Sequence, residues 1–367
     1  MILSGKLLPN ERLPSENELK QRYSVSRFTV QHALRLLVSE GLVTRRQGLG
    51  TFVRHPVDGL MPRDEQIILH LGGINEPETP LTQGHFLFAR RLEELTRGQI
   101  KIQVHHSSEL GAGTEQIKKV QNNQLDMFGA AVDWLAQLEP DWGVTNMGFL
   151  FRDIKHLKVF VKSSINETLK RRLLERRALR IVSDNWFRPS RVLISYKPCF
   201  ELKDLQGARM RIPAIPMYRK VWESLGTCPV EIPWGAVRDS LYRGIVDAAD
   251  TPRDAILGMG FHRVAPFITL TRHLYSRACI VMAEVRFRSF RSDIRDAILR
   301  AGEEAGELYS SRVREIFLDD KNKLIQEGAR FIETDIEPFR CRIRSLAERM
   351  EREGAWSKGL YRTIQEL

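Results

Sequence analysis

Basic and amide side chains near the start of this chain are the residues whose types and spacing most clearly indicate chemistry. The first 56 residues contain nine Lys and Arg against four acidic residues, so +5 of the net charge of +11 lies in under a sixth of the length. Such clustering favours contact with phosphates and release of counterions. Arg27 and Gln31 also carry donors of the kind that read base edges. The chemistry indicated is binding to a nucleic acid.

Two short helices and a hairpin are the elements that must position these side chains. Ser15, followed three residues later by Glu18, is a capping box that opens a helix ending near residue 23. Ser26 caps a second helix with an apolar stripe, which leaves its first turn free to face outward. Residues 42–46 and 51–54 read as strands around a glycine-rich tip. The pattern predicts two helices joined by a tight turn and followed by a β-wing.

The motifs LPSE, VSRxTV and EGLVxRRQGxGTFV, within residues 1–54, resemble the GntR-type winged helix-turn-helix of bacterial transcription regulators. The resemblance implies that the partner is double-stranded operator DNA, read by the second helix and the wing. Thr29 is either a phosphate contact or a support for the first turn of that helix. The other implied contacts are Ser26 and Arg27 at the start of the helix, and Arg45, Arg46, Gln47 and Gly48 in the wing.

Three features depart from that family. Asn17 and Gln31 stand where the family usually has arginine, so they would exchange guanine-type contacts for adenine-type ones or weaken binding. The family also has a helix before this segment, and Met1 falls inside its last turn. We therefore expect either a start upstream of Met1 or a domain that lacks one supporting helix.

The rest of the chain has a different character. Residues 55–65 carry prolines and a glycine and read as a linker. Beyond them, strands alternate with helices at 83–96 and 114–124, which indicates an α/β layer architecture, and from residue 292 the pattern is almost all helical. The expected strands cover residues 67–71, 100–105, 125–130, 179–183, 190–195, 209–212, 228–231 and 248–250.

Several signatures then follow in order, the most specific being KPCFELKDLQGARMRIP and LGTCPVEIPWGAVRDSLYRGIVDAAD. Over about residues 66 to 350 they resemble the DctP-type solute-binding proteins of TRAP transporters. The resemblance implies a periplasmic-binding-protein-like α/β clamp of two lobes that closes on a small carboxylate. We therefore predict three parts: a DNA-binding domain at 1–54, a linker at 55–65 and a solute-binding domain at 66–367.

The resemblance also implies particular ligand contacts. Arg211 stands where the family places its carboxylate-clamping arginine, and the guanidinium fork matches a carboxylate bidentately. Arg191 matches a second family arginine, although the neighbouring Arg188 is an alternative. Asp250 and Thr251 occupy the family's Glu-Asn positions, and threonine still donates one hydrogen bond. Two residues complete these predictions, namely Trp234, which is either a pocket wall or core, and His273, which we expect to be structural.

Other functions find no support in the sequence. We recognise no nucleophile motif, zinc-protease motif or phosphate-binding loop, so we predict neither an enzyme nor a cofactor. The four cysteines are scattered, without metal-ligand spacing. We find no run of eighteen apolar residues and no apolar leader, so we expect no membrane span and a cytoplasmic location.

Together these features predict a ligand-responsive transcription regulator. A small organic acid would close the clamp and shift two DNA-binding domains within a homodimer on a pseudo-palindromic operator. The alternative is a solute-binding protein that serves a TRAP membrane permease and carries a vestigial regulator fragment.

Overall fold

The computed structural model describes residues 7, 11–39, 42–46, 49–53 and 66–367. The first part holds α1 (Glu16–Tyr23), α2 (Arg27–Ser39), β1 (Val43–Arg46) and β2 (Gly50–Val53). The predicted capping box is present, because Ser15 Oγ accepts from the Glu18 N–H at 3.3 Å and the Ser15 N–H donates to Glu18 Oε2 at 2.7 Å. The helices begin where the sequence predicts them, and each strand begins within one residue of its predicted start.

The hairpin of β1 and β2 is antiparallel, with Val43 opposite Val53 and Arg46 opposite Gly50. One side of it packs on the helices. A small apolar cluster forms there from Leu13, Val30, Leu34, Val43 and Val53. The helices and the hairpin thus share one core, as the winged helix-turn-helix pattern requires.

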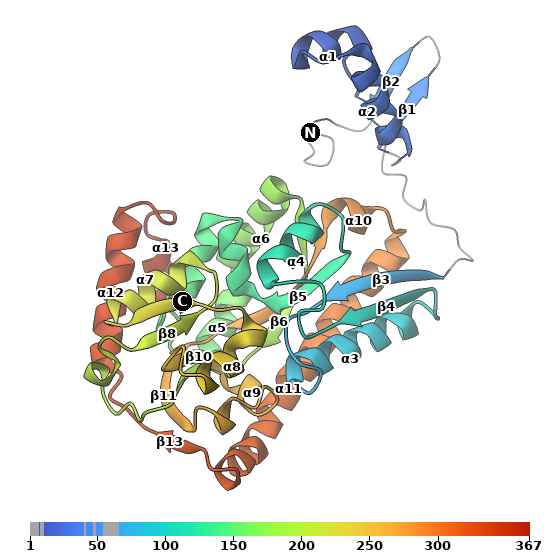
Figure 1. Ribbon diagram of the computed structural model, residues 1–367. Helices are drawn as coiled ribbons and strands as arrows, with labels where there is room; N and C mark the ends of the chain where they lie inside the picture. Colours follow the sequence, from blue (N-terminus) through green and yellow to red (C-terminus); the bar gives the residue numbers. More distant parts are fainter. Residues whose placement is uncertain (1–6, 8–10, 40–41, 47–48, 54–65) are drawn as a thin grey trace.

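Two β-sheets form the body of the chain, one in each lobe (Figure 1). The first sheet has the order β4 (Ile100–His105), β3 (Ile67–Gly72), β5 (Met127–Ala131), β12 (Arg277–Ala283) and β6 (Leu179–Phe187). The second has the order β13 (Arg330–Ile332), β11 (Phe267–Leu274), β7 (Arg191–Ser195), β10 (Ala248–Pro252), β8 (Arg209–Ile212) and β9 (Cys228–Glu231). The predicted two-lobed α/β architecture is confirmed.

Helices cover both sheets. The longer ones are α3 (Pro80–Leu95), α4 (Gly113–Gln121), α5 (Ile154–Val161), α6 (Ser164–Arg177), α7 (Pro216–Ser224), α11 (Ser292–Gln326) and α12 (Glu337–Arg352). The shorter ones are α8 (Val237–Tyr242), α9 (Arg253–Ile256), α10 (Glu284–Arg288) and α13 (Leu360–Gln365). Short 3-10 helices, η1 (Val132–Gln137), η2 (Pro140–Asn146), η3 (Leu202–Leu205), η4 (Trp234–Ala236) and η5 (Phe261–Arg263), line the connections.

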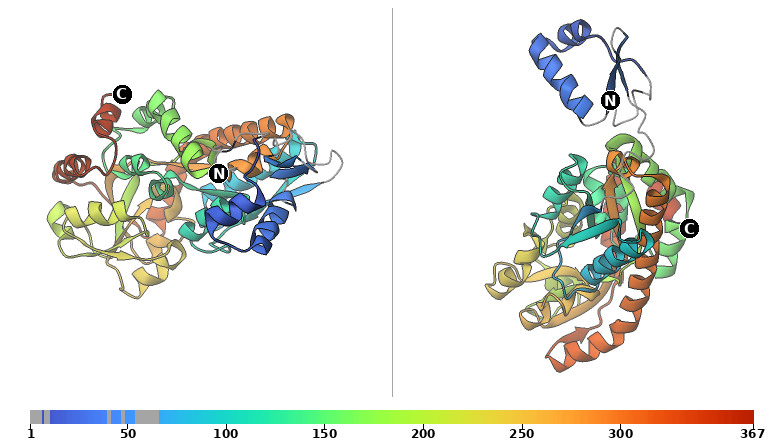
Figure 2. Two further views of the ribbon diagram at one scale, coloured as in Figure 1. Left: turned by 90° about the horizontal axis from the view of Figure 1, so that it is seen from above. Right: turned by 90° about the vertical axis from the view of Figure 1, so that its right-hand side faces the viewer.

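The chain passes repeatedly between the lobes. It passes between β6 and β7, returns between β11 and β12, and leaves the first lobe again along α11, which runs the length of the body to β13 (Figure 2). Glycines let α11 approach β6 closely, because a Cβ on Gly306 would lie 2.8 Å from Cδ1 of Trp186. The lobes are therefore joined by paired strand crossings and by one long packed helix.

Apolar clusters hold each lobe together. One lies between the first sheet and helices α3 and α11, and another lies under the second sheet with α8 and α9. A larger cluster draws residues from both sheets and from α12 and α13. Among the described residues, no helix combines the length and the apolar character needed to cross a bilayer.

Candidate functional site

Between the two sheets lies a pocket with a cavity volume of about 50 Å³. That volume is below the roughly 300–1,000 Å³ of typical small-molecule sites. Its walls come from both lobes: Ile74, Asn75, Ala130, Ala131, Asp133 and Trp134 from the first, and Arg211, Pro213, Ile215, Tyr218, Trp234 and Pro252 from the second, with Arg188 and Arg191 near the crossing between them. Arg191, Arg211 and Trp234, three of the predicted ligand contacts, therefore meet in one cavity.

Arg211 has fewer hydrogen-bond partners than the other arginines of the pocket, counted within the described residues. It lies in β8, is only 3% exposed, and donates from Nε to the carbonyl oxygen of Ile232 at 2.9 Å. Its Cζ sits 5.3 Å from the centre of the Trp234 ring. Within the described part of the chain, its two terminal nitrogens make no hydrogen bond. Burial lowers the pKa of Arg211 to about 10, so the side chain stays charged at neutral pH.

Arg191 is held firmly by contrast. Its guanidinium donates twice to Asp250 Oδ1, once from Nε at 2.8 Å, and His273 Nε2 contacts Asp250 Oδ2 at 3.1 Å. Burial alone would raise the pKa of Asp250, but Arg191 and His273 outweigh it and keep that pKa below its ordinary value. Asp250 and Thr251, which are both buried, are not among the residues that form the pocket wall. The structure thus places Asp250 against Arg191, while the Thr251 hydroxyl donates to the carbonyl oxygen of Pro252 at 3.2 Å.

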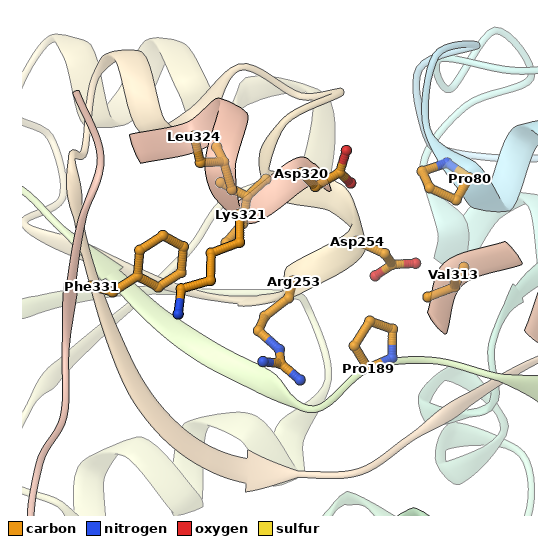
Figure 3. A pocket seen from close by; sticks show the side chains of 10 residues that line it. Pro80, Pro189, Arg253, Asp254, Val313, Asp320, Lys321, Leu324 and Phe331 are labelled. Atoms are coloured by element: carbon orange, nitrogen blue, oxygen red, sulfur yellow. The ribbon is translucent and has the colours of Figure 1, made fainter. Parts of the chain in front are cut away.

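The alternative cation, Arg188, is already paired. It donates from Nη2 to Asp254 Oδ1 at 3.0 Å and from Nε to Asp254 Oδ2 at 3.3 Å, and the Tyr309 hydroxyl of α11 donates to the same carboxylate at 2.7 Å. Asp254 also lines a second pocket beside α11, between Pro189 and Val313 (Figure 3). This cluster ties the lobe crossing to the long helix.

Two wall residues that sequence reasoning missed carry polar groups into the pocket. Asp133 is buried, and its Oδ2 accepts from the Tyr218 hydroxyl at 2.7 Å. Burial raises the pKa of Asp133, although the nearby Arg191 opposes the change. Asn75 follows β3 just as Asp133 follows β5. Because ligands of open α/β sheets bind beyond the carboxyl ends of the strands, that position is the signal that could have identified both residues.

In the N-terminal part, a single carboxylate contacts three of the side chains that we predict to bind DNA. Glu16 accepts from Gln31 Nε2 at 2.9 Å, lies 3.5 Å from Arg27 Nε, and pairs with Arg45. The hydrogen bond from Gln31 and the neighbouring arginines lower the pKa of Glu16. The start of α2, the wing and α1 therefore meet at one polar surface.

The remaining predicted contacts lie close by. Ser26 Oγ accepts from the Thr29 N–H at 3.1 Å and is 2.8 Å from the Thr29 hydroxyl, so Thr29 joins the first turn of α2. Asn17 is exposed on α1, and Arg46 lies over the ring of Phe52 at 5.0 Å. Two further predicted contacts, Gln47 and Gly48, lie outside the described residues.

Comparison with known families identifies both parts. The sequence model of the bacterial extracellular solute-binding proteins, family 7, matches residues 71–353. The chain belongs to this family. Residues 1–53 match the model of the bacterial regulatory proteins of the gntR family. Both resemblances seen in the sequence are thereby confirmed.

Individual relatives agree with this membership. A solute-binding protein of Roseobacter denitrificans is 25% identical over 277 residues, 76% of this chain and 85% of that protein. The 2,3-diketo-L-gulonate-binding periplasmic protein of Escherichia coli is 26% identical, covering 68% of this chain and 75% of its own length. A crystal structure of a TRAP periplasmic solute binding protein from Roseobacter denitrificans, with bound L-galactonate, superposes with a TM-score of 0.76 at 23% identity, over 82% of this chain and 98% of the other.

The comparisons also bear on two further predictions. The relatives and solved structures described above are named as solute-binding proteins, in agreement with the expectation that the chain is not an enzyme. The predicted cytoplasmic location is wrong. Similar proteins are named as periplasmic, and they point to the periplasm instead. That prediction relied on local apolar patterns, which are a weaker guide to location than the kinship of the larger domain.

Proposed function

We propose that the family 7 domain is a clamp for a small organic acid, whose carboxylate Arg211 receives with Arg191 beside it. The observation that carries this proposal is the buried, charged guanidinium of Arg211, of which only Nε has a partner in the described part of the chain. A buried charge without a counter-ion is costly, and a carboxylate supplies two matched acceptors. Trp234 would lie against the ligand. Asp250 and Thr251 would support the arginines without touching the ligand.

The relatives guide the choice of compounds. The Escherichia coli relative is named for 2,3-diketo-L-gulonate, a Vibrio cholerae relative for sialic acid, and the solved Roseobacter denitrificans structure holds L-galactonate. All three compounds are carboxylates with several hydroxyls. A screen of aldonates and uronates is therefore the natural start.

Isothermal titration of the full chain with these acids tests the proposal. Arg211→Lys removes the planar fork but keeps the charge, and we expect it to weaken the best ligand by about 10- to 100-fold. The matched control is Arg209→Lys, on the same strand, where the arginine is exposed and paired with Asp247. Equal affinities in Arg211→Lys and the wild type would overturn the assignment of the carboxylate to Arg211.

We further propose that the chain is organised as a DNA-binding domain at 1–54, a linker at 55–65 and a ligand clamp at 66–367, and that a homodimer regulates transcription. Clamp closure would change the affinity for double-stranded operator DNA. The match of residues 1–53 to the gntR family and the exposed basic side chains of α2 and the wing support this proposal.

DNA binding measured by fluorescence anisotropy tests this second step. We expect Arg27→Ala to lower the affinity and the salt slope, and saturating ligand to change the wild-type affinity severalfold. Arg22→Ala, an exposed residue of α1 outside the predicted contacts, is the control.

A second candidate function is favoured by the periplasmic names of the relatives. In this alternative, the clamp delivers its ligand to a TRAP membrane permease and the N-terminal part is vestigial. A periplasmic location would separate residues 1–54 from DNA. DNA affinity unaffected by both Arg27→Ala and ligand would therefore favour the transport function over regulation.

A further inference from the structure

Two histidines face each other at the edge of the first sheet, and neither lines the pocket between the lobes. His70 belongs to β3, and His105 ends β4, the edge strand that pairs with β3 in parallel (Figure 1). In the register of the two strands, His70 lies opposite Gln103 and His105 lies opposite Gly72. The histidines are therefore diagonal neighbours, and His70 Nδ1 is 2.9 Å from His105 Nε2.

The pair lies on the solvent side of these strands. Side chains alternate between the two faces of a sheet. Leu69 and Leu71 are fully buried in the apolar core of the first lobe, whereas His70 between them is exposed. The side chain of His105 keeps 16% of its surface exposed. A small solute can therefore reach the two facing nitrogens from outside.

A glutamate determines which nitrogen of His105 carries the proton. Glu109 Oε2 lies 3.4 Å from His105 Nδ1, on the other side of the ring from His70. The negative charge favours the tautomer protonated at Nδ1, which leaves the Nε2 lone pair directed at His70. Histidines that bind metals have this arrangement, with one ring nitrogen on the ion and the other N–H held by a carboxylate.

The spacing of the two facing nitrogens fits one metal ion. Zn–N bonds of roughly 2.0–2.1 Å at the tetrahedral angle place two ligand nitrogens about 3.3 Å apart. The observed separation is 2.9 Å, so small rotations of the two side chains open the required space. Without an ion, His70 Nδ1 donates its proton to His105 Nε2. When an ion binds, His70 takes the tautomer protonated at Nε2, and its Nδ1 lone pair becomes a ligand.

We propose that His70 and His105 bind one divalent transition-metal ion of the class that prefers imidazole, namely Zn²⁺, Ni²⁺ or Cu²⁺. The described part of the chain holds no group of three or more metal-binding side chains, so water fills the remaining coordination positions. The site is thus open and exchangeable, unlike a structural zinc centre with four protein ligands. Because the ion joins β3 to β4, its binding stabilises the first lobe.

Isothermal titration of the full chain, free of any histidine tag, with ZnCl₂ and with NiCl₂ tests the proposal. We expect one ion per chain, and we expect His70→Gln and His105→Gln each to weaken binding at least tenfold. Glu109→Gln should weaken it about tenfold, because it removes the carboxylate that orients His105. The matched control is His106→Gln, next in the chain, whose Nδ1 contacts Ser107 Oγ at 2.9 Å. This variant should keep the wild-type affinity.

Thermal denaturation in EDTA shows whether each variant is folded, and added Zn²⁺ should raise the midpoint of the wild type but not that of His70→Gln. Absence of binding to the wild type would show that the histidines form only a hydrogen-bonded pair, and would overturn the inference. Wild-type affinity in both His70→Gln and His105→Gln, or an equal loss in His106→Gln, would place the ion elsewhere and overturn it too. The binding of organic acids is measured separately, so neither result bears on the carboxylate clamp.

Discussion

His85 makes the stability of the first lobe depend on pH. The side chain lies in α3, is 1% exposed, and its Nδ1 has no partner among the described residues. Burial, aided by the charge of Arg188, lowers the pKa of His85 from 6.5 to about 4. As the pH falls through 6.5, the unfolded chain therefore binds a proton before the folded chain does. The contribution of His85 to stability is complete above pH 6.5, declines between pH 6.5 and 4, and levels off below.

The size of this effect follows from the two pKa values. The full window is worth about 3 kcal/mol, at roughly 1.4 kcal/mol per pH unit, and the change from pH 7 to pH 5 is worth about 2 kcal/mol. Urea denaturation at both pH values, in wild type and His85→Gln, measures it. We expect the wild type to lose about 2 kcal/mol more than the variant. His106→Gln, at a less buried site, should behave like the wild type. An equal loss in wild type and His85→Gln would refute the reasoning.

Three other substitutions have definite expected outcomes. Gly306→Val should destabilise the chain by about 2 kcal/mol or more in thermal denaturation, because its side chain would press into Trp186; unchanged stability would contradict the close packing of α11. Asp250→Asn should weaken acid binding by about tenfold in titration calorimetry, since Arg191 loses the carboxylate that orients it; wild-type affinity would argue against this positioning. Ser15→Ala should speed amide hydrogen exchange in α1 about fivefold, because it removes a helix cap worth about 1 kcal/mol. Unchanged exchange would show that the cap does not stabilise α1.

Much of the fold could be predicted because the local patterns are strong. The strands expected at 100–105, 209–212 and 228–231 are β4, β8 and β9, with the same bounds. None of the predicted strands corresponds to β12, which inserts between β5 and β6 in the first sheet. Its neighbours are remote in sequence, and such pairing depends on tertiary packing rather than on local propensity. The short strand β13 likewise lies in a stretch that reads as helical.

The site shows the same division. Motifs marked Arg191, Arg211 and Trp234, and all three line the pocket. Nothing local could reveal that Asp250 would pair with Arg191, or that Arg188 would be occupied by Asp254. Those pairings depend on which buried charged side chains come together where the chain crosses between the two lobes. The location prediction had a different weakness, because it relied on local apolar patterns.

The interleaved path of the chain also determines the order in which the molecule is built during translation. The first sheet lacks β12 until residue 283 has been made, and the second lacks β13 until residue 332. Neither lobe is therefore a contiguous unit that folds alone on the ribosome, whereas the residues that match the gntR family emerge first. The nascent chain would present its basic segment long before a clamp exists to hold a ligand. Any control that the ligand exerts is consequently possible only on the finished chain.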